Sequence, residues 1–363
     1  MLFILAATTI AERGFGREVV SRWVYGAWWF VGAWAFLGVA AFVYIIRRAL
    51  YRRAAAFALH LAFALILLGA LITFLSAERG YLHLRQGEAL HTYMPDGGGA
   101  ERLLPFEAKL LLFDVTYHPG TAEPADFTST LRVDGDTCRV SMNVIHARRG
   151  YRLYQFSCDP DGLGSTLFLN RDPWGIGVTY AGYLLLALAM GWLLWSRVGW
   201  RWLSGALVPL AGAWLYIARL DLATPVLRSP MLAAHVSVIA ISYALLLFIA
   251  VTGGVALARR GLGECLRRLN TRLLYMALCL LAAGIFTGAA WANISWGRYW
   301  GWDAKETWAL VTLLLYALPL HGESLPYFRD PARFHLYCLL AFLAVLMTFL
   351  GVTYFLGGLH GYI

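Results

Sequence analysis

Residues 273–308 read LLYMALCLLAAGIFTGAAWANISWGRYWGWDAKETW, and they decide the class of fold. The first twenty of them, residues 273–292, are apolar and long enough to cross a bilayer as one helix. The stretch that follows, residues 291–308, carries Trp291, Trp296, Trp300, Trp302 and Trp308. The pattern therefore predicts a membrane-spanning helix that delivers a tryptophan-rich stretch to one side of the membrane.

The tryptophans are open to two interpretations. Flat, polarisable rings suit a flat hydrophobic ligand, whereas Trp and Tyr also gather at membrane–water interfaces as an aromatic belt. The acids of the stretch have a structural interpretation as well. Asp303, followed three residues later by Glu306, has the pattern of a helix N-cap with its partner at the third helical position.

The composition of the whole chain agrees with a membrane protein. Of its 363 residues, 60% are hydrophobic and only 14% are charged, which is too apolar for a soluble fold. The net charge of +9 comes almost wholly from arginines beside apolar segments, a pattern of membrane orientation rather than of nucleic-acid binding. The five cysteines form no CxxC or CxxCH motif, so a zinc site or covalently attached haem on this chain is not expected.

The arginine clusters at the ends of the apolar segments give one alternating topology, with arginines on the cytoplasmic side. We expect an α-helical polytopic membrane protein with about eight full transmembrane helices plus a partial N-terminal span at residues 1–11. The predicted full spans are residues 23–46, 57–75, 175–195, 203–217, 231–257, 273–292, 306–321 and 336–356. In this topology the tryptophan-rich stretch and the C-terminus are periplasmic.

Residues 81–174 have a different pattern, because apolar and polar residues alternate in short runs interrupted by turns such as Asp134-Gly135. Such alternation predicts strands. We therefore expect one small β-rich periplasmic domain at 81–174, between a transmembrane segment at 1–80 and another at 175–363.

The topology sorts four histidines by depth. His60 and His321 fall at the cytoplasmic ends of their helices, and His235 and His360 at the periplasmic ends, level with the tryptophans. A lone helical histidine is more often a hydrogen-bonded packing residue than a ligand. Two depth-matched pairs, however, suit axial ligation of two haem irons, one pair to each iron.

The other histidines and the cysteines are expected to have no such role. His335 is predicted in a solvated cytoplasmic link, and the remaining histidines in the β-rich domain, where they are also expected to be solvated: His83, His91, His118 and His146. Cys138 and Cys158 lie on the oxidising side of the predicted membrane, so a disulfide and two unpaired thiols both remain open.

Several segments together resemble a known family. WANISWGRYWGWDAKETW resembles the tryptophan-rich WWD motif of the CcsA (ResC) half of the System II cytochrome c synthase, and LRSPMLAAHVSVIAISYA and GVTYFLGGLHGYI resemble two further segments of that half. ALHLAFALILLGALIT and the run from SMNVIHARRGYRLYQFSCDPDG to NRDPWGIGVTYAGY resemble the CcsB (ResB) partner. The order is that of a CcsB–CcsA fusion. Two positions differ from the family pattern, with Ala304 in place of a proline and Gly361 in place of a serine.

The resemblance implies haem export across the bacterial inner membrane and covalent attachment of haem b to the CxxCH cysteines of an apocytochrome c, as in a holocytochrome c synthase. Thiol-reducing proteins would be further partners, and nucleic acid would not. His60 and His321 would ligate haem within the membrane. His235 and His360 would ligate it at an external site beside Trp291, Trp296, Trp300, Trp302, Asp303 and Trp308. The alternatives are a non-enzymatic haem transporter or chaperone, a b-type cytochrome and a membrane scaffold without haem.

Overall fold

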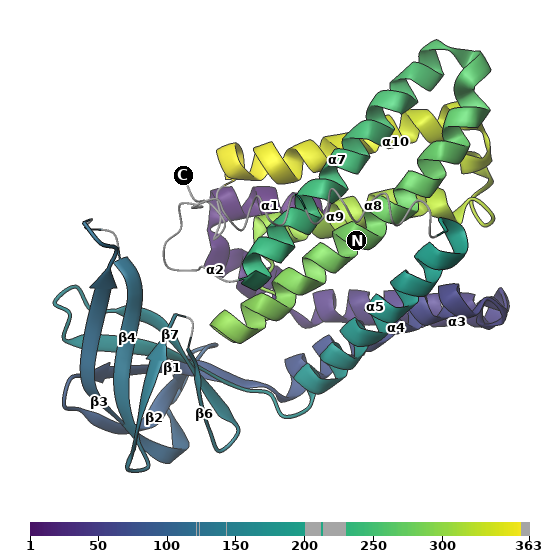
Figure 1. The fold of residues 1–363 in the computed structure, drawn as a ribbon. Helices are drawn as coiled ribbons and strands as arrows, with labels where there is room; N and C mark the ends of the chain where they lie inside the picture. The colour runs from purple at the N-terminus through teal and green to yellow at the C-terminus, as the bar shows by residue number, and fades with distance from the viewer. Residues whose placement is uncertain (121, 123, 143, 200–211, 213–229, 357–363) are drawn as a thin grey trace.

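The computed structural model describes residues 1–120, 122, 124–142, 144–199, 212 and 230–356. Long helices form one part of the molecule, and a sheet lies at one end of them (Figure 1). The sheet is inserted between helix α4 (Ala54–Ser76) and helix α5 (Gly175–Arg197). Only Ala77 separates α4 from the first strand, so the sheet is held close to the ends of these two helices.

Six helical segments among the described residues are long and apolar enough to cross a membrane. They are α3 (Trp28–Arg47), α4, α5, α7 (Pro230–Ala258), α8 (Gly263–Trp296) and the continuous segment Pro331–Leu356, which comprises α10 (Pro331–Leu346) and the π-helical η7 (Met347–Leu356). The predicted polytopic helical class is thus confirmed. The predicted span at 203–217 lies outside the described residues, so the count of eight remains a prediction.

The predicted span at 306–321 is built from two pieces. Helix α9 (Ala304–Ala317) continues directly into a 3-10 turn, η5 (Leu318–His321). Pro319 explains the change, because proline has no N–H and its ring clashes with the carbonyl four residues earlier in an α-helix. The two pieces rise about 21 Å and about 8 Å, so together they are about as long as a hydrocarbon core is thick, roughly 30 Å.

The N-terminal segment differs from its prediction at one boundary. It comprises α1 (Leu2–Phe15), α2 (Arg17–Val20) and the π-helical turn η1 (Ser21–Tyr25). The predicted helix at 23–46 begins only at Trp28, because Ala27 has an extended backbone with φ −82° and ψ 141°. Helix α1 packs on α9 and, at fourteen residues, is too short to span, as expected.

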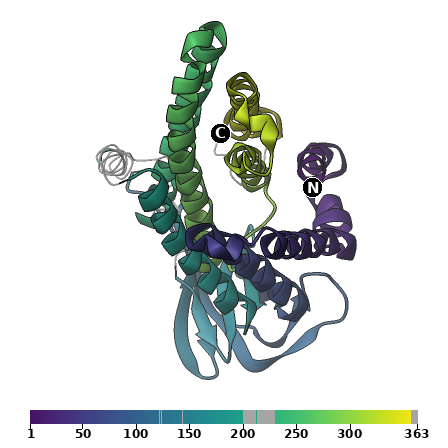
Figure 2. The same ribbon diagram turned by 90° about the vertical axis from the view of Figure 1, so that its right-hand side faces the viewer.

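Helix α8 is the most buried of the six candidate spans. Helix α7 packs along it, α10 packs on α7, and α9 contacts both α8 and α1 (Figure 2). Leu246 of α7, Leu274 and Leu281 of α8 and Tyr316 of α9 are fully buried in the shared core. Three short turns complete the helical part: η2 (Leu50–Arg52), η4 (Arg260–Leu262) and η6 (Pro326–Arg329).

Glycines allow α4 and α5 to approach each other closely. A Cβ at Gly69 of α4 would lie 2.3 Å from the Thr179 hydroxyl and 2.7 Å from the Thr179 backbone nitrogen. A Cβ at Gly182 of α5 would lie 2.7 Å from Ile66. Small residues at such crossings let two membrane helices pack backbone against backbone, so the two helices that carry the sheet form one tightly packed pair.

The sheet has eight antiparallel strands in the order β5-β4-β3-β2-β1-β8-β7-β6. The strands are β1 (Glu78–Arg85), β2 (Ala89–Pro95), β3 (Arg102–Tyr117), β4 (Pro124–Val133), β5 (Asp136–Ser141), β6 (His146–Arg148), β7 (Tyr151–Cys158) and β8 (Gly164–Arg171). The two outer strands β5 and β6 contact each other, so the sheet curls into an open barrel. Strands are confirmed in the stretch where alternation predicts them, whereas the periplasmic location and the three-part division remain predictions.

Alternating side chains fill the barrel, as the period of a strand requires. In β3, Leu104, Phe106, Ala108 and Leu110 point inward and are buried. The turn between β4 and β5 has positive φ at Asp134 (49°) and Gly135 (90°), the geometry of a two-residue hairpin turn. This turn confirms Asp134-Gly135 as the break between two strands.

The five cysteines are all free. Cys138 lies in β5 opposite Leu131, whereas Cys158 ends β7 opposite Ser165. Of the two alternatives for this pair, the structure therefore has the unpaired thiols.

Candidate functional site

Two histidines that are far apart in sequence meet at the end of the helical part remote from the sheet. His60 lies near the start of α4 and His321 ends η5. Their ring centres are 6.0 Å apart and the ring planes are at 89°. His60 is half-buried and His321 is exposed, so the pair is accessible from outside the protein.

Both rings are oriented by the backbone of their own helices. Nδ1 of His60 lies 2.7 Å from the carbonyl oxygen of Ala56, and Nδ1 of His321 lies 2.9 Å from that of Ala317. A carbonyl only accepts, so each Nδ1 carries the proton and donates it. The Nε2 lone pairs are left for another partner, and neither Nε2 has a hydrogen bond within the described residues. A histidine that ligates a metal has the same arrangement.

The separation of the two rings fits a shared iron. Two axial imidazoles on one iron have their ring centres about 6 Å apart, because each metal–nitrogen bond is about 2 Å long. The observed 6.0 Å agrees with this value. Edge-to-face packing of two aromatic rings also occurs at this distance. Metal ligation is favoured over such packing because neither Nε2 has a hydrogen-bond partner within the described residues.

The turn after His321 is bonded to the end of α3 and to the α3–α4 connection. Arg53 forms an ion pair with Glu323 at 2.5 Å, and the hydroxyls of Tyr44 and Ser324 are hydrogen-bonded. The Arg53–Glu323 pair is exposed, so its contribution to stability is small. These contacts set the position of His321 relative to His60 rather than stabilise the fold.

At the other end of the helices, the tryptophan stretch leaves α8 and turns into α9. Helix α8 ends at Trp296 and is followed by Gly297, which has a left-handed φ of 74°, the usual form of a helix C-terminus. Helix α9 begins with a complete capping box: the Asp303 carboxylate accepts from the Lys305 nitrogen at 2.9 Å, and the Glu306 carboxylate accepts from the Asp303 nitrogen at 3.3 Å. The predicted N-cap role of Asp303 is confirmed.

This cap gives a testable expectation. Asp303→Ala removes the side-chain acceptor from a residue that is only 2% exposed, so it should cost about 1 kcal/mol, whereas Asp303→Asn should cost much less. The shift of the unfolding midpoint in detergent measures the difference. Asp330→Ala gives the comparison at an exposed N-cap, since the Asp330 side chain accepts from the Arg333 nitrogen at the start of α10. An Asp303→Ala variant as stable as the unaltered chain would contradict the expectation.

The five tryptophans occupy different surroundings. Trp291 is buried and packs edge-on against Trp296 at 4.9 Å. Trp300 packs against the helical core, while Trp302 and Trp308 face the N-terminal segment. Trp300 and Trp302 contact each other edge-on at 5.7 Å, so the tryptophans are divided among different neighbours rather than arranged as one continuous surface.

His235 belongs to α7 and packs against the face of α8 that carries Trp291. Its Nδ1 is 2.7 Å from the Gly284 carbonyl oxygen, and a Cβ at Gly288 would lie 2.6 Å from its ring. Gly284, Gly288 and Trp291 share one face of the helix because they are four and three residues apart. The predicted partner of His235, His360, lies outside the described residues.

The prediction for His335 was wrong. His335 lies within α10, is fully buried, and its Nε2 is 3.0 Å from the Gly263 carbonyl oxygen. The apolar predicted span at 336–356 begins one residue later, but the helix itself starts at Pro331 with the Asp330 cap. The cap extends the helix through the predicted link, and His335 therefore packs against the start of α8.

The sheet contacts the tryptophan stretch directly, which sequence analysis did not predict. The buried Asn170 side chain of β8 donates to the Gly297 carbonyl at 2.5 Å, and the buried Tyr154 hydroxyl of β7 donates to the Asn293 carbonyl at 3.3 Å. Burial raises the pKa of the Tyr154 hydroxyl, so it remains a donor at neutral pH. We call this contact between sheet and tryptophan stretch the seam.

Arg298 extends the seam. Its guanidinium donates to the Tyr81 hydroxyl at 3.0 Å, pairs with Asp96 at 3.1 Å and lies over the Phe168 ring at 4.5 Å from the ring centre. A planar guanidinium can pair with a carboxylate and stack on an aromatic face at once. An arginine inside an aromatic stretch was the only sequence signal of this contact.

Tyr299 joins the seam to the helix pair that carries the sheet. Its hydroxyl donates to Thr73 of α4 at 2.6 Å, and the Thr73 hydroxyl donates to Asp172 at 2.6 Å. Asp172 also accepts from the Gly175 nitrogen at the start of α5. The seam is therefore continuous from the sheet through the ends of α4 and α5 to the tryptophan stretch.

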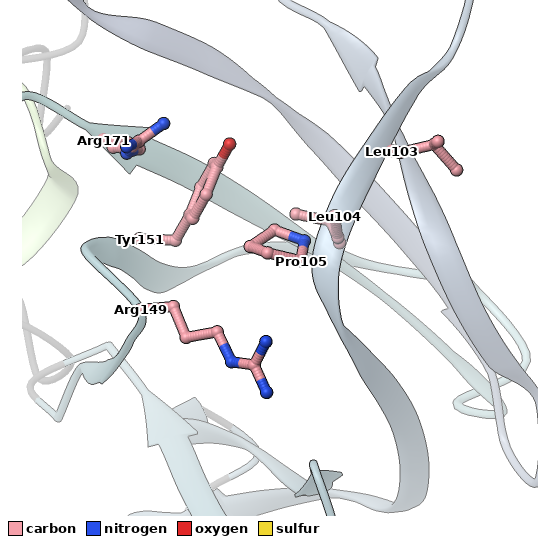
Figure 3. A pocket seen from close by; sticks show the side chains of 6 residues that line it. All are labelled: Leu103, Leu104, Pro105, Arg149, Tyr151 and Arg171. Atoms are coloured by element: carbon pink, nitrogen blue, oxygen red, sulfur yellow. The ribbon is translucent and has the colours of Figure 1, made fainter.

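A separate hollow lies on the sheet. It has a volume of about 390 Å³ and is lined by Leu103, Leu104, Pro105, Arg149, Tyr151 and Arg171 (Figure 3). Both arginines have acidic partners, since Arg171 pairs with Glu78 and Arg149 with Asp134. None of the lining residues belongs to the histidine pairs or to the tryptophan stretch.

Two family models match consecutive parts of the chain. Residues 47–172 match the ResB-like family, and residues 183–360 match the family described as cytochrome C assembly protein. Together they take in the sheet, the seam, both histidine pairs and the tryptophan stretch.

Individual relatives agree with these matches. The chain is 38% identical over 204 residues to the protein NrfI of Wolinella succinogenes, covering 51% of this chain and 22% of the relative. It is 42% identical over 113 residues to the cytochrome c biogenesis protein CcsA of Gloeobacter violaceus, covering 31% of this chain and 32% of the relative. The CcsA of Pyropia yezoensis is 42% identical over 106 residues, covering 29% and 32%. The matched regions thus span less than a third of the length of each of these relatives.

Proposed function

Because the chain belongs to the System II cytochrome c biogenesis family, with a ResB-like part followed by a CcsA-like part, we propose that it exports haem and attaches it to apocytochrome c. The acceptor would be the two cysteines of a CxxCH motif, and the activity that of a holocytochrome c synthase. Haem b would be the substrate.

The observation that carries the proposal is the His60–His321 pair. Two imidazoles from different helices approach to 6.0 Å, and each is oriented by a backbone carbonyl so that its Nε2 is open to a metal. The absence of a hydrogen bond to either Nε2 within the described residues supports haem ligation more than simple packing. His60 and His321 would hold haem on its way outward.

The proposed orientation in the bacterial inner membrane follows from charge. The cluster of Arg47, Arg48, Arg52 and Arg53 lies at the end of α3 and in its connection to α4, at the opposite end of α4 from the sheet. Positive clusters favour the cytoplasmic side. The sheet, the seam and the tryptophan stretch would then be periplasmic, and the chain would take haem at the His60–His321 end.

At the external site, His235 and His360 would supply the axial ligands. The tryptophans and Asp303 would contribute one wall of the site, which comprises Trp291, Trp296, Trp300, Trp302, Asp303 and Trp308. The position of His235 on the same face of α8 as Trp291 supports this assignment. Asp303 would act through the cap that fixes the start of α9, and so the position of Trp302 beside it.

The attachment itself is an addition reaction. Each cysteine thiol adds across one haem vinyl group, so that a carbon–sulfur bond forms and the thiol proton ends on the other vinyl carbon. The atoms balance without a leaving group. The role of the protein would be to hold haem and peptide in register, since orientation alone lowers the barrier of such a step substantially. The cysteines must arrive reduced, which is why thiol-reducing proteins would be partners.

The test uses the full chain expressed with a CxxCH reporter apocytochrome in a bacterium that lacks its own maturation system. His60→Ala and His321→Ala should each remove most of the haem that co-purifies with the chain and reduce covalent haem on the reporter by about tenfold or more, because one axial ligand is lost. Haem staining of the reporter and the absorption spectrum of the purified chain are the measurements. His91→Ala, on the exposed side of the sheet, is the control.

Each outcome separates the candidate functions. Haem on the chain without covalent haem on the reporter would favour the haem transporter or chaperone. Haem on neither would rule out both. Full reporter maturation by both histidine variants would remove the His60–His321 pair from the pathway.

A further inference from the structure

The first 34 residues lie outside both family matches, yet they contact the tryptophan stretch. The Arg17 guanidinium donates to the Gly301 carbonyl at 3.1 Å. The indole N–H of Trp308 donates to the Thr9 hydroxyl at 3.0 Å. Both bonds join residues almost 300 positions apart in the chain, so the N-terminal segment and the tryptophan stretch are in direct contact.

Tyr25 makes the one parallel ring contact that the described residues make with Trp302. Its ring stacks on Trp302 with 5.1 Å between ring centres and 6° between ring planes. Phe30 lies edge-on to Trp302 at 5.1 Å, and Trp34 lies at 6.3 Å. Tyr25 is itself fixed, because it is buried and its hydroxyl donates to Thr8 at 3.0 Å. One face of the Trp302 indole is therefore held by a rigid partner.

Trp302 needs such a partner because its backbone is strained. Its φ is 55°, in the left-handed region that bulky side chains rarely adopt. Such a conformation persists only where the surroundings hold it, and it is common at binding sites. Trp302 is followed by the Asp303 cap. It is preceded by Gly301, whose backbone is held at both ends: its nitrogen donates to Glu306 and its carbonyl accepts from Arg17.

Two buried donors beside Trp302 lack acceptors. The indole nitrogens of Trp34 and Trp300 are buried and have no hydrogen-bond partner within the described residues. Buried donors are almost always paired in folded proteins. A cluster that combines a strained residue with unpaired donors therefore has the character of a binding site more than of an ordinary core.

From these contacts we infer that residues 1–34 form one wall of the external haem site and that Tyr25 is a positioning residue that holds Trp302 against the substrate. The inference rests on the proposed function. It adds to the site a segment that no family match covers, and it assigns Tyr25 a role through the orientation of Trp302 rather than through contact with the reacting atoms.

The test compares two variants of Tyr25. Tyr25→Leu removes the stacked ring, whereas Tyr25→Phe keeps the ring and loses only the bond to Thr8. Tyr25→Leu should lower covalent haem on the CxxCH reporter by about tenfold or more, as expected when a positioning contact is lost, and should change the absorption spectrum of the haem on the purified chain. Tyr25→Phe should keep the covalent haem on the reporter and the absorption spectrum close to those of the unaltered chain. Trp23→Leu, an exposed aromatic residue of the same turn, is the control.

Arg17→Gln provides a second variant at an exposed position, and it should also lower reporter maturation, by a smaller factor. If the Tyr25→Leu chain does not accumulate in the membrane, the Arg17→Gln variant tests the inference instead. Normal maturation by Arg17→Gln would then overturn the inference. Normal maturation by Tyr25→Leu would also overturn the inference, and so would an equal loss of maturation in Tyr25→Leu and Tyr25→Phe. Either result would leave the proposed function intact. An unaltered chain without any haem would overturn both.

Discussion

Gly297→Ala is expected to release the tryptophan stretch from the sheet and to stop cytochrome maturation while the helical part remains folded. Gly297 has a φ of 74°, and a Cβ there would lie 2.6 Å from the Tyr154 ring. The left-handed conformation costs alanine about 1–2 kcal/mol, and overpacking against a buried ring costs about 1–3 kcal/mol more. Tyr154 cannot retreat easily, since it is buried and bonded to Asn293.

The reporter assay measures this prediction. Covalent haem on the CxxCH reporter should fall at least about tenfold, since the expected cost exceeds 1.4 kcal/mol, while the purified chain should retain the haem proposed to bind at His60 and His321. Gly301→Ala is the matched control in the same loop, because a Cβ there would meet its nearest atoms only at 3.5 and 3.7 Å. Equal maturation by the two alanine variants would show that the seam does not matter for attachment.

The second large effect is expected at the crossing of α4 and α5. Gly69→Val should force the two helices apart, because even its Cβ would lie 2.3 Å from the Thr179 hydroxyl and 2.7 Å from the Thr179 nitrogen. A backbone atom cannot rotate away as a side chain can. The free energy of unfolding should fall by at least about 1–3 kcal/mol, the range typical of overpacking. Less folded chain should be recovered in detergent, with a lower unfolding midpoint.

Two further variants sharpen this test. Thr179→Ala should rescue Gly69→Val only in part, because it removes the hydroxyl but leaves the backbone nitrogen in place. Gly191→Val on α5 should be tolerated, since a Cβ there would meet no atom within 4 Å. A Gly69→Val chain as stable as the Gly191→Val chain would mean that the backbones of α4 and α5 do not approach each other closely at Gly69.

The parts of the fold that sequence predicts are those set by local pattern. Long apolar runs predict α3, α4, α5, α7 and α8, and alternation predicts the strands, because each signal is complete within one segment. The Asp303 cap is predicted for the same reason, since both partners lie within four residues. Where a boundary depended on a single backbone conformation, as at Ala27, prediction placed the start of the helix too early.

The parts of the site that sequence does not predict depend on contacts between distant segments. The depth of His60 and His321 follows from topology, but their proximity depends on how α4 and α9 are placed in space. The Asn170–Gly297 bond and the Tyr25–Trp302 stack join residues more than 100 positions apart. No pattern within either segment indicates its partner, and His335 was misplaced because the cap that extends its helix lies outside the apolar run.

The fusion of the two parts has a consequence for the seam. The sheet and the tryptophan stretch, which form the two sides of the seam, belong to one chain, and Ala77 and residues 172–174 hold the sheet close to α4 and α5. Because both sides belong to one chain, their encounter is intramolecular, with an effective concentration set by the length and stiffness of the chain that connects them. A seam of a few hydrogen bonds, too weak to join two free proteins at cellular concentrations, can therefore remain closed here. Cutting the chain between α5 and α7 would remove this advantage, and the seam would then depend on the affinity of the two pieces for each other.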